Sequence, residues 1–533
     1  MEEFAVAATT TSRRLPRKYG VWRVVGLRSV RLGSQKRRFD GQERNDGTAV
    51  FPFGGCVVSV SGSWVAMRNT KITCTIGPST ESSEMLEKMI RGGMNVARLN
   101  MSHATHEWTR DIFQRIRAAS EKVGIPCAIM MDTQGPSIRT GDLPIPMELK
   151  PGDIFEFTVK GAQSEEEKSV DVNYPNLVKD IHEGDTVLVD NGVIRLRVLE
   201  KLHRRMRCEV LTQGELGSRR HINLPGVKIS MPSITEKDRQ DVALGISLGI
   251  DIIALSFVRE RKDIEELREI LLAGNSEARI IAKIEDQQAV VNLHDLIDAA
   301  DGIMVARGDL GIECPYEELP IIQRRTVKAC IRKGRPVIVA THMLESMIEN
   351  PMPTRAEVTD VANAVFEQAD SVMLSGETTV GKYPLECLEV LDRIAQRIER
   401  SGGANYAEDV ELTEERQKIV RAAVVMANEL KAKGLLVFTR YGHMAQYTSW
   451  LRPNHSRIFA FTNNERIRNQ LNLHWGVMPQ LIQFSEDPEE TVLRAEQVLL
   501  ERGYLAKGDQ VVIVSDILAH DKVINAVQMR IVE

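Results

Sequence analysis

The sequence between residues 252 and 306 contains three short apolar runs: IIALSF at 252–257, IIAKIE at 280–285 and GIMVA at 302–306. Each run is nearly continuous in apolar residues, which is typical of a strand covered on both faces of a parallel sheet. Helix-like stretches separate the runs. The pattern therefore predicts consecutive β-α units.

Working outward, five more runs of this kind complete a set of eight, at 72–76, 95–100, 127–132, 337–341 and 371–374. Eight β-α units predict an α/β protein built on a (β/α)8 TIM barrel. One interval, from 127 to 252, spans 125 residues and is too long for a single loop. We therefore expect an inserted domain there. The stretch TVLVDNG at 186–192 resembles a hairpin, with Asn191-Gly192 in its turn, so the insert is predicted to be a small β-barrel that serves as a lid.

Beyond residue 405 the pattern changes to a second, open α/β sheet. A helix is expected over 414–433 with Gly434 as its C-cap, followed by strands at 435–439, 457–462, 478–484 and 510–515. Residues 515–522 are expected to form a loop. The predicted domains are a leader at 1–66, the barrel in two parts at 67–141 and 227–404, the β lid at 142–226 and the C-terminal α/β domain at 405–533.

Composition excludes several classes of protein. The chain has 533 residues with 43% hydrophobic and 27% charged residues, which is ordinary for a globular protein. No apolar run is long enough to span a membrane, and the net charge of −5 argues against nucleic acid as a partner. Seven scattered cysteines without a CxxC pair argue against a zinc site and favour a reducing compartment. We therefore expect a cytoplasmic protein.

The first 66 residues differ from the rest of the chain. They hold eleven Lys or Arg and five Asp or Glu, a net charge of +6. Arg-rich leaders can be transit peptides, although Glu2 and Glu3 fit that class poorly. We interpret the segment as a disordered leader, or as the result of a start assigned upstream of Met67, with a basic arm for nucleic acid as the alternative.

The predicted barrel strands end in polar residues, and catalytic groups of a barrel lie at those ends. Lys283 and Glu285 are two residues apart on one strand, so both side chains point to the same face. Glu285 and Asp309 offer carboxylate oxygens, which suit Mg²⁺ or Mn²⁺ better than zinc. Arg98, Arg139 and Lys283 supply positive charge for a phosphorylated substrate. This combination is typical of phosphoryl transfer.

Six ordered motifs resemble the pyruvate kinase family: NTKITCTIGP from residue 69, RLNMSH from 98, DTQGPSIRTG from 132, IAKIE from 281, MVARGDLG from 304 and PTRAE from 353. The resemblance implies a barrel, a β lid and a C-terminal α/β domain, assembled as a homotetramer. It implies transfer of a phosphoryl group from phosphoenolpyruvate to ADP in glycolysis, giving pyruvate and ATP.

The resemblance also implies roles for individual residues. Lys283 would stabilise the transferring group and the enolate, and Thr341 would lie near the protonation step. The remaining implied roles are phosphoenolpyruvate contacts at Arg98, Gly308, Asp309 and Thr341, Mg²⁺ (or Mn²⁺) ligands at Glu285 and Asp309, K⁺ ligands at Asn100, Ser102, Asp132 and Thr133, and nucleotide contacts at Asn100 to His103, Arg139 and Arg220.

Ser137 departs from the family pattern, because K⁺-requiring members usually carry Glu there and K⁺-independent members carry Lys. The C-terminal turn at 439–445 and the expected loop at 515–522 also differ from those of regulated members, so fructose 1,6-bisphosphate is expected to have little effect. Two alternatives stay open: a Mg²⁺-dependent barrel lyase or aldolase acting on a pyruvate enolate, and a regulatory binding protein on an inactive barrel.

Overall fold

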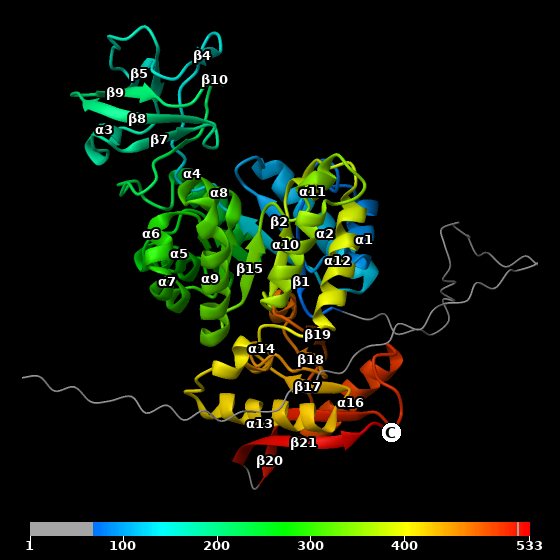
Figure 1. Cartoon of the computed structure of the whole chain (residues 1–533). Coiled ribbons are helices and arrows are strands. Elements are labelled where there is room, and N and C mark those ends of the chain that lie inside the picture. Colours follow the sequence, from blue (N-terminus) through cyan, green and yellow to red (C-terminus); the bar gives the residue numbers. More distant parts are fainter. Residues whose placement is uncertain (1–67, 520–521) are drawn as a thin grey trace, which may run out of the picture. The chain divides into compact units, whose positions relative to one another are not determined.

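The computed structural model describes residues 68–519 and 522–533, so the predictions for residues 1–66 lie outside it. Eight parallel strands close into a barrel in the order β1-β16-β15-β14-β13-β12-β3-β2 (Figure 1). Their bounds are β1 Lys71–Thr75, β2 Val96–Asn100, β3 Ala128–Asp132, β12 Ile252–Leu255, β13 Arg279–Ile284, β14 Gly302–Ala306, β15 Val337–Ala340 and β16 Ser371–Leu374. All eight predicted strands are present, and the TIM barrel is confirmed.

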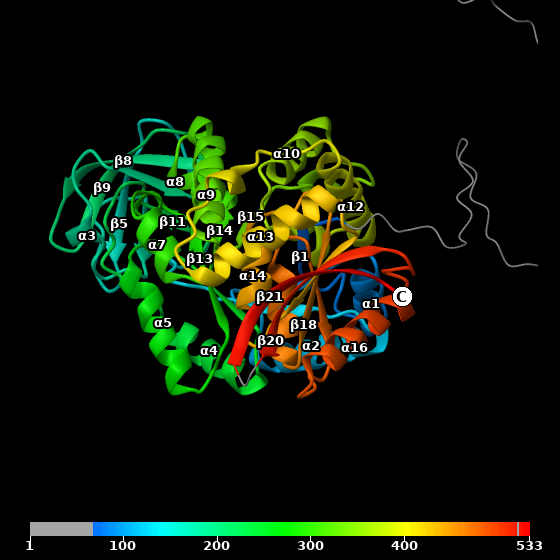
Figure 2. The ribbon, with the colours of Figure 1, turned by 90° about the horizontal axis from the view of Figure 1, so that it is seen from below.

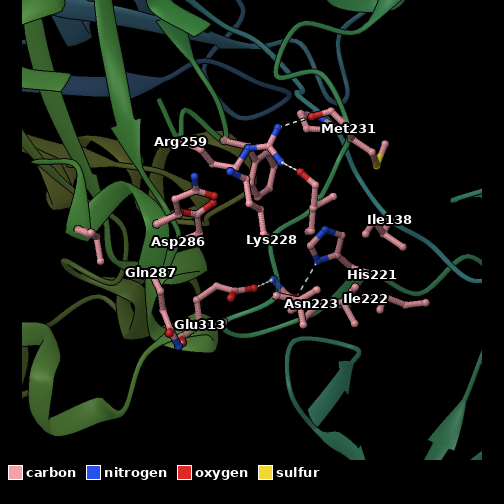
Figure 3. A pocket seen from close by; sticks show the side chains of 18 residues that line it. Ile138, His221, Ile222, Asn223, Lys228, Met231, Arg259, Asp286, Gln287 and Glu313 are labelled. Carbon is pink, nitrogen blue, oxygen red and sulfur yellow. Dashed lines mark hydrogen bonds between the residues drawn. The ribbon is translucent and has the colours of Figure 1, made fainter. Parts of the chain in front are cut away.

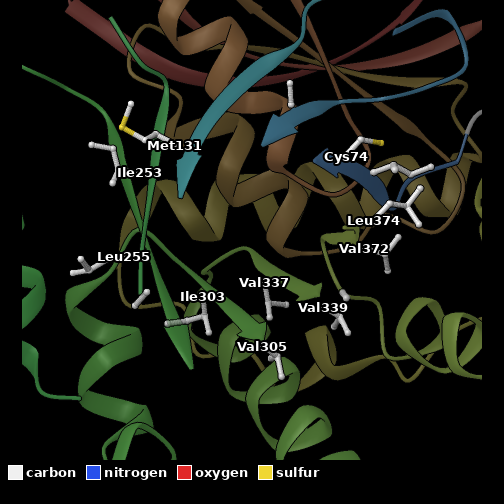
Figure 4. Close-up of a cluster of buried hydrophobic side chains, with 14 of the residues drawn as sticks. Cys74, Met131, Ile253, Leu255, Ile303, Val305, Val337, Val339, Val372 and Leu374 are labelled. Carbon is white, nitrogen blue, oxygen red and sulfur yellow. The ribbon is translucent and has the colours of Figure 1, made fainter. Parts of the chain in front are cut away.

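Side chains of each barrel strand alternate between two apolar cores. On β13, Ile280, Ala282 and Ile284 face outward into the layer beneath the helices, whereas Ile281 belongs to the barrel interior. Figure 4 shows outward-facing members of the first core, including Val305, Val337 and Val372. This period of two places Lys283 on the interior side, whereas the sequence predicted only that Lys283 and Glu285 share a face.

Helices cover the barrel between consecutive strands. Three of them start at threonines whose hydroxyls accept a backbone N–H two or three residues into the helix: Thr105, Thr235 and Thr354. The helices are α1 Ser83–Arg91, α2 His106–Val123, α4 Glu236–Leu248, α5 Arg261–Ala273, α6 Gln287–Val291, α7 Leu293–Ala299, α8 Arg307–Glu313, α9 Leu319–Lys333, α10 Arg355–Phe366, α11 Gly376–Thr379 and α12 Pro384–Glu399.

The insert after β3 is a β domain, as predicted, with its own apolar core. Its six-stranded sheet runs β11-β7-β8-β9-β5-β6, and β10 pairs with β4 separately. The segment 138–141 bridges the two edges of this sheet: Ile222 in β11 donates its N–H to the Ile138 carbonyl at 2.8 Å, and Gly141 donates its N–H to the Asp171 carbonyl in β6 at 2.7 Å. The edges therefore meet through short β-bridges, in agreement with the small barrel we expected. The bounds are β4 Met147–Leu149, β5 Ile154–Val159, β6 Ser169–Val172, α3 Leu177–Asp180, β7 Thr186–Val189, β8 Ile194–Lys201, β9 Arg205–Val210, β10 Gly214–Leu216 and β11 Ile222–Asn223.

The C-terminal domain is an open sheet in the order β19-β18-β17-β20-β21, with helices on both faces. Figure 2 shows α13 and α16 on opposite sides of its strands, and each helix packs into a separate apolar core. The bounds are α13 Glu415–Leu430, β17 Gly434–Phe438, α14 His443–Trp450, β18 Arg457–Thr462, α15 Glu465–Gln470, β19 Val477–Leu481, α16 Pro488–Glu501, β20 Gln510–Ala519 and β21 Lys522–Ile531.

Two sequence expectations for this domain are wrong. The helix ends at Leu430, where Lys431 adopts a left-handed conformation, and Gly434 instead begins β17. A Cβ at Gly434 would lie 2.8 Å from the Phe459 ring, so close strand packing explains this glycine. Residues 515–519 belong to β20 and pair with β21 in an antiparallel hairpin, which replaces the expected loop.

The C-terminal domain also fills the lower end of the barrel. Leu473, in the short 3-10 helix Leu471–Leu473, is 2% exposed and belongs to the barrel's interior core together with Met304 and Met373. Gly476 donates its N–H to the Asn69 carbonyl (2.9 Å), and Lys71 Nζ donates to the Val477 carbonyl (2.5 Å). The first barrel strand is therefore tied directly to this domain. No helix among the described residues is long and apolar enough to cross a membrane.

We expect Leu473→Ala to lower the free energy of unfolding by about 2–5 kcal/mol, because it leaves a cavity where two domains share a core. Urea unfolding followed by circular dichroism measures this change. The matched control is Leu272→Ala on α5, where the leucine is 67% exposed. Equal effects of the two substitutions would contradict the role assigned to Leu473.

Candidate active site

A polar cavity of about 410 Å³ opens at the carboxyl ends of β2, β3, β12 and β13, beneath loops of the β lid. Nine of the residues predicted from the sequence line it: Arg98, Asn100, Ser102, Thr133, Arg139, Arg220, Lys283, Glu285 and Asp309. Asp132 lies fully buried beneath it. Gly308 and Thr341 stand beside Asp309, whereas His103 is exposed and is not among the lining residues.

Lys283 is the centre of a buried network of charges. Its Nζ lies 3.0 Å from Asp132 Oδ1 and 2.8 Å from Glu285 Oε1, and it donates a hydrogen bond to Ser256 Oγ at 2.7 Å. The second Glu285 oxygen accepts the Phe257 N–H at 2.7 Å. These contacts fix the ammonium group at the cavity floor.

Burial and charge act in opposite directions on these groups. Burial disfavours the ammonium of Lys283, but Asp132 and Glu285 more than offset burial and raise its pKa. Burial raises the pKa of Glu285 to about 7, and Asp309 adds to this rise while Lys283 opposes it. Burial alone would raise the pKa of Asp132, yet Lys283 and Arg98 hold it below its ordinary value. The lysine is therefore charged at neutral pH.

Arg98 completes the network on the side of β2. Its Nε donates to Asp132 Oδ2 at 2.6 Å and its Nη1 donates to Thr75 Oγ1 at 2.9 Å. Asp132 consequently holds Arg98 through one oxygen and Lys283 through the other. Two cations thus face the cavity at fixed positions, as binding of an anionic substrate requires.

The mouth between β14 and β15 has a strained backbone. Thr341 and His342 have φ values of 69° and 54°, which is rare for residues other than glycine and rarest for a β-branched one. Thr341 Oγ1 accepts the Gly308 N–H at 2.7 Å, and Arg307 donates to the Thr341 carbonyl at 2.5 Å. Arg307 also pairs with Asp360 at 2.7 Å. Strand β15 and helix α8 therefore hold Gly308 and Thr341 together.

The donor set suits a divalent cation that keeps other positions free. Glu285 and Asp309 both line the cavity, and Mg²⁺ in phosphate sites is usually bound by one or two carboxylates. Among the described residues, His, Cys, Asp and Glu form no cluster of three or more that could enclose a metal.

The donors predicted for a monovalent cation are also oxygen atoms. Asn100, Ser102 and Thr133 line the same cavity, above the buried Asp132. Ser137 Oγ is buried at this cavity and has no hydrogen-bond partner in the described part of the chain. An unpaired buried hydroxyl is costly unless a ligand or water satisfies it, so this wall fits an additional polar ligand.

The lid supplies the outer wall. Arg220 Nη1 donates to Asp190 Oδ1 at 3.3 Å, and Arg139 Nη1 donates to the Arg219 carbonyl at 3.1 Å. A second cavity of about 320 Å³ lies on the other side of His221 and Phe257 (Figure 3). There Asn223 Nδ2 donates to Glu313 Oε1 at 2.9 Å, which joins the lid to α8.

Three residues that shape the site were not predicted from the sequence. Ser256 bonds to Lys283 and donates to the Thr133 carbonyl at 2.7 Å. Phe257 binds Glu285 through its backbone at a φ of 52°. Arg307 holds Thr341. Ser256 and Phe257 directly follow β12, so their place at a strand end was the available signal.

Comparison with known proteins agrees with this geometry. A family model described as "Pyruvate kinase, barrel domain" matches residues 67–388, and one described as "Pyruvate kinase, alpha/beta domain" matches residues 417–528. A chloroplastic pyruvate kinase isozyme G of Nicotiana tabacum is 45% identical over 84% of this chain and 80% of its own.

Relatives from other organisms share the resemblance. The pyruvate kinase of Staphylococcus aureus (strain MRSA252) is 39% identical over 85% of this chain and 78% of its own. The crystal structure of a pyruvate kinase from Cryptosporidium parvum superposes with a TM-score of 0.84 at 34% identity, covering 87% of this chain and 96% of that one. The chain therefore belongs to the pyruvate kinase family of phosphotransferases.

Proposed function

We propose that the polar cavity binds phosphoenolpyruvate and ADP, and that the residues around Lys283 carry out the transfer. The phosphoryl group leaves the enol oxygen of phosphoenolpyruvate and bonds to a β-phosphate oxygen of ADP. The enolate then takes a proton at its terminal carbon and becomes pyruvate. The observation that carries this proposal is the buried Lys283, held between Asp132 and Glu285 at the floor of the cavity.

Each residue has a role that its position supports. Arg98 and the Gly308 backbone bind the substrate phosphate, and Lys283 neutralises charge that grows on the transferring group and on the enolate. Thr341, whose hydroxyl accepts the Gly308 N–H, would lie near the carbon that gains the proton. Arg139, Arg220 and Asn100 contact the nucleotide from the lid side and the β2 end. His103, being outside the lining, is a weaker candidate for a nucleotide contact.

Two cations belong to the proposed site. Glu285 and Asp309 would hold Mg²⁺ (or Mn²⁺), and Asn100, Ser102, Asp132 and Thr133 would hold K⁺. When bound, the divalent ion neutralises phosphate charge and orients the phosphates. The decisive assay couples pyruvate formation to lactate dehydrogenase, with phosphoenolpyruvate as substrate and ADP present or omitted. No pyruvate from phosphoenolpyruvate in either case would contradict the kinase and favour a barrel lyase or aldolase, which releases pyruvate by breaking a carbon–carbon bond of another substrate.

Compartment and assembly are part of the same proposal. The names of the relatives from Nicotiana tabacum and Arabidopsis thaliana place those proteins in chloroplasts or plastids. We therefore favour a plastid over the cytoplasm expected from the sequence, with the Arg-rich leader as the targeting segment; import of the full chain into isolated chloroplasts tests this. We also propose that the chain assembles as a homotetramer, and light scattering would measure the mass of the assembly.

We expect Lys283→Met to lower kcat by roughly 10²–10³-fold with a much smaller change in KM, because the ammonium acts on charge that grows in the transition state. Steady-state kinetics measures both constants, and circular dichroism checks folding, since the substitution removes the ammonium that lies against both Asp132 and Glu285. A folded variant with near-normal kcat would remove Lys283 from the mechanism.

Ser256→Ala should lower kcat about 10-fold or more, because a hydrogen bond to a charged group is lost. The KM for ADP should stay unchanged, since Ser256 positions Lys283 and does not reach the lid. Ser247→Ala, on the exposed side of α4, is the matched control. A fall in stability without the split between kcat and KM would assign Ser256 a structural role only.

K⁺ should activate the enzyme, because four oxygen donors are grouped and Ser137 supplies no positive charge of its own. Rates in K⁺ are compared with rates in tetramethylammonium at equal ionic strength. Ser137→Lys should reduce the dependence on K⁺, whereas the control Ser218→Lys, on the lid side of the same cavity, should not. Equal rates of the unchanged enzyme in the two salts would contradict a K⁺ site.

A further inference from the structure

Two segments of chain join the lid to the barrel, and the second of them is a long loop. This return segment runs from residue 224 to residue 235, between β11 and the start of α4. It lies between two cavities, the one of about 320 Å³ shown in Figure 3 and another of about 850 Å³, and residues 226–229 line both. A segment with open space beside it depends on specific contacts for its position.

Arg259 holds the return segment from the barrel side. Its guanidinium group, between β12 and α5, donates to the Ile229 carbonyl at 2.6 Å and to the Met231 carbonyl (Figure 3). It also donates to the Ser233 hydroxyl at 3.3 Å, and that hydroxyl donates to the Phe257 carbonyl at 3.3 Å. Only arginine offers a planar fork of donors that binds several acceptors in one fixed geometry.

The backbone of Arg259 is itself fixed to the barrel. Its N–H donates to Asp263 Oδ2 at 2.9 Å, and its carbonyl accepts a hydrogen bond from Asn292 Nδ2 at 2.7 Å. Asp263 belongs to the first turn of α5, and Asn292 lies between α6 and α7. The outer helices therefore hold the base of the side chain that binds the return segment.

The lid holds the same segment from its own side. Asp180, at the end of α3, accepts hydrogen bonds from the Ser230 N–H at 2.8 Å and from the Ser230 hydroxyl at 2.9 Å. The Tyr174 hydroxyl donates to Asp180 and accepts the Ser230 N–H at 2.9 Å. The carbonyls of Ile229 and Met231 thus bind the barrel, while the residue between them binds the lid.

The run of residues 256–259 also reaches the floor of the proposed active site. Lys283 donates to the Ser256 hydroxyl at 2.7 Å, and the Phe257 N–H donates to Glu285 at 2.7 Å. Two residues further along the chain, the same run binds the return segment of the lid. One short stretch of backbone therefore fixes the catalytic groups and the lid relative to each other.

We propose that Arg259 is a positioning residue, which holds the lid so that Arg139 and Arg220 stand at the nucleotide side of the catalytic cavity. The inference rests on the proposed function, in which ADP binds beneath the lid and phosphoenolpyruvate binds at the barrel floor. Arg259 is outside the lining of the catalytic cavity and acts through the backbone of the return segment. Its loss should therefore weaken the binding of ADP and spare that of phosphoenolpyruvate.

Arg259→Met should raise the KM for ADP about tenfold, the loss expected when hydrogen bonds from a charged donor disappear. The Kd of phosphoenolpyruvate, measured by isothermal titration calorimetry with Mg²⁺ and K⁺ but without ADP, should stay the same. Arg259→Lys keeps the charge but not the fork, and should show most of the same increase. The matched control is Arg268→Met on α5, which removes a donor to the Ala299 carbonyl at 2.9 Å and should change neither constant.

Hydrogen–deuterium exchange of the full chain without substrates tests the same contact independently of kinase activity. Peptides that cover residues 226–233 should exchange about fivefold faster or more in Arg259→Met, while peptides from β13 should keep their rate. Asp180→Asn loosens the segment from the lid side. Because both contacts act through one segment, the double variant should raise the KM for ADP by less than the product of the two single effects.

Three results would overturn the proposal: unchanged exchange at residues 226–233, an equal weakening of ADP and phosphoenolpyruvate binding, or faster exchange in β13 as well. The last of these would assign Arg259 a structural role only. An unchanged chain that forms no pyruvate from phosphoenolpyruvate and ADP would instead contradict the proposed function, and the exchange at 226–233 would then decide separately whether Arg259 holds the lid.

Discussion

The arrangement of the barrel mouth depends on one buried ion network. Asp132 accepts a hydrogen bond from Arg98 with one oxygen and lies against Lys283 with the other, and Glu285 pairs with Lys283 as well. Moving these charges from water into the protein interior costs free energy. Well-packed apolar side chains in their place would often make the folded protein at least as stable. The network persists as a unit because every member is partnered, including by the Ser256 hydroxyl and the Phe257 N–H. Its value therefore lies in fixed charge at the mouth rather than in stability.

The barrel explains why these groups meet. Parallel strands place their carboxyl ends at one rim, and alternation along each strand sends every second side chain inward. On β13 this rule separates Ile281 and Lys283 from Ile280 and Ala282, and on β3 it directs Asp132 inward beyond Met130. The eight strands and the shared face of Lys283 and Glu285 could accordingly be predicted from spacing alone.

Other features could not be predicted because they depend on distant backbone. Thr341 adopts a left-handed conformation, and Arg307 and Gly308 from the preceding β-α unit hold its carbonyl and its hydroxyl in place. The sequence around Gly434 is typical of a helix end. The structure instead requires glycine there because the Phe459 ring leaves no room for a side chain. The sequence that forms the hairpin β20–β21 contains polar residues typical of a turn. Backbone pairing of the two strands at ten positions nevertheless keeps this segment extended.

Helix α9 makes contacts toward both ends of the barrel. One face of the helix carries Arg324, Arg325 and Lys328 beside the C-terminal domain. Its buried face carries Gln323, whose amide oxygen accepts a hydrogen bond from Arg307 at 3.3 Å. Arg307 in turn binds the Thr341 carbonyl at the mouth. Gln323 and Arg324 also share Glu367, through its two oxygens. Glu367 therefore holds Gln323 and, through it, Arg307. Polar contacts thus connect Arg324 on the outer face of α9 with the strained backbone at Thr341, so the geometry of that loop depends on helix packing well away from the mouth.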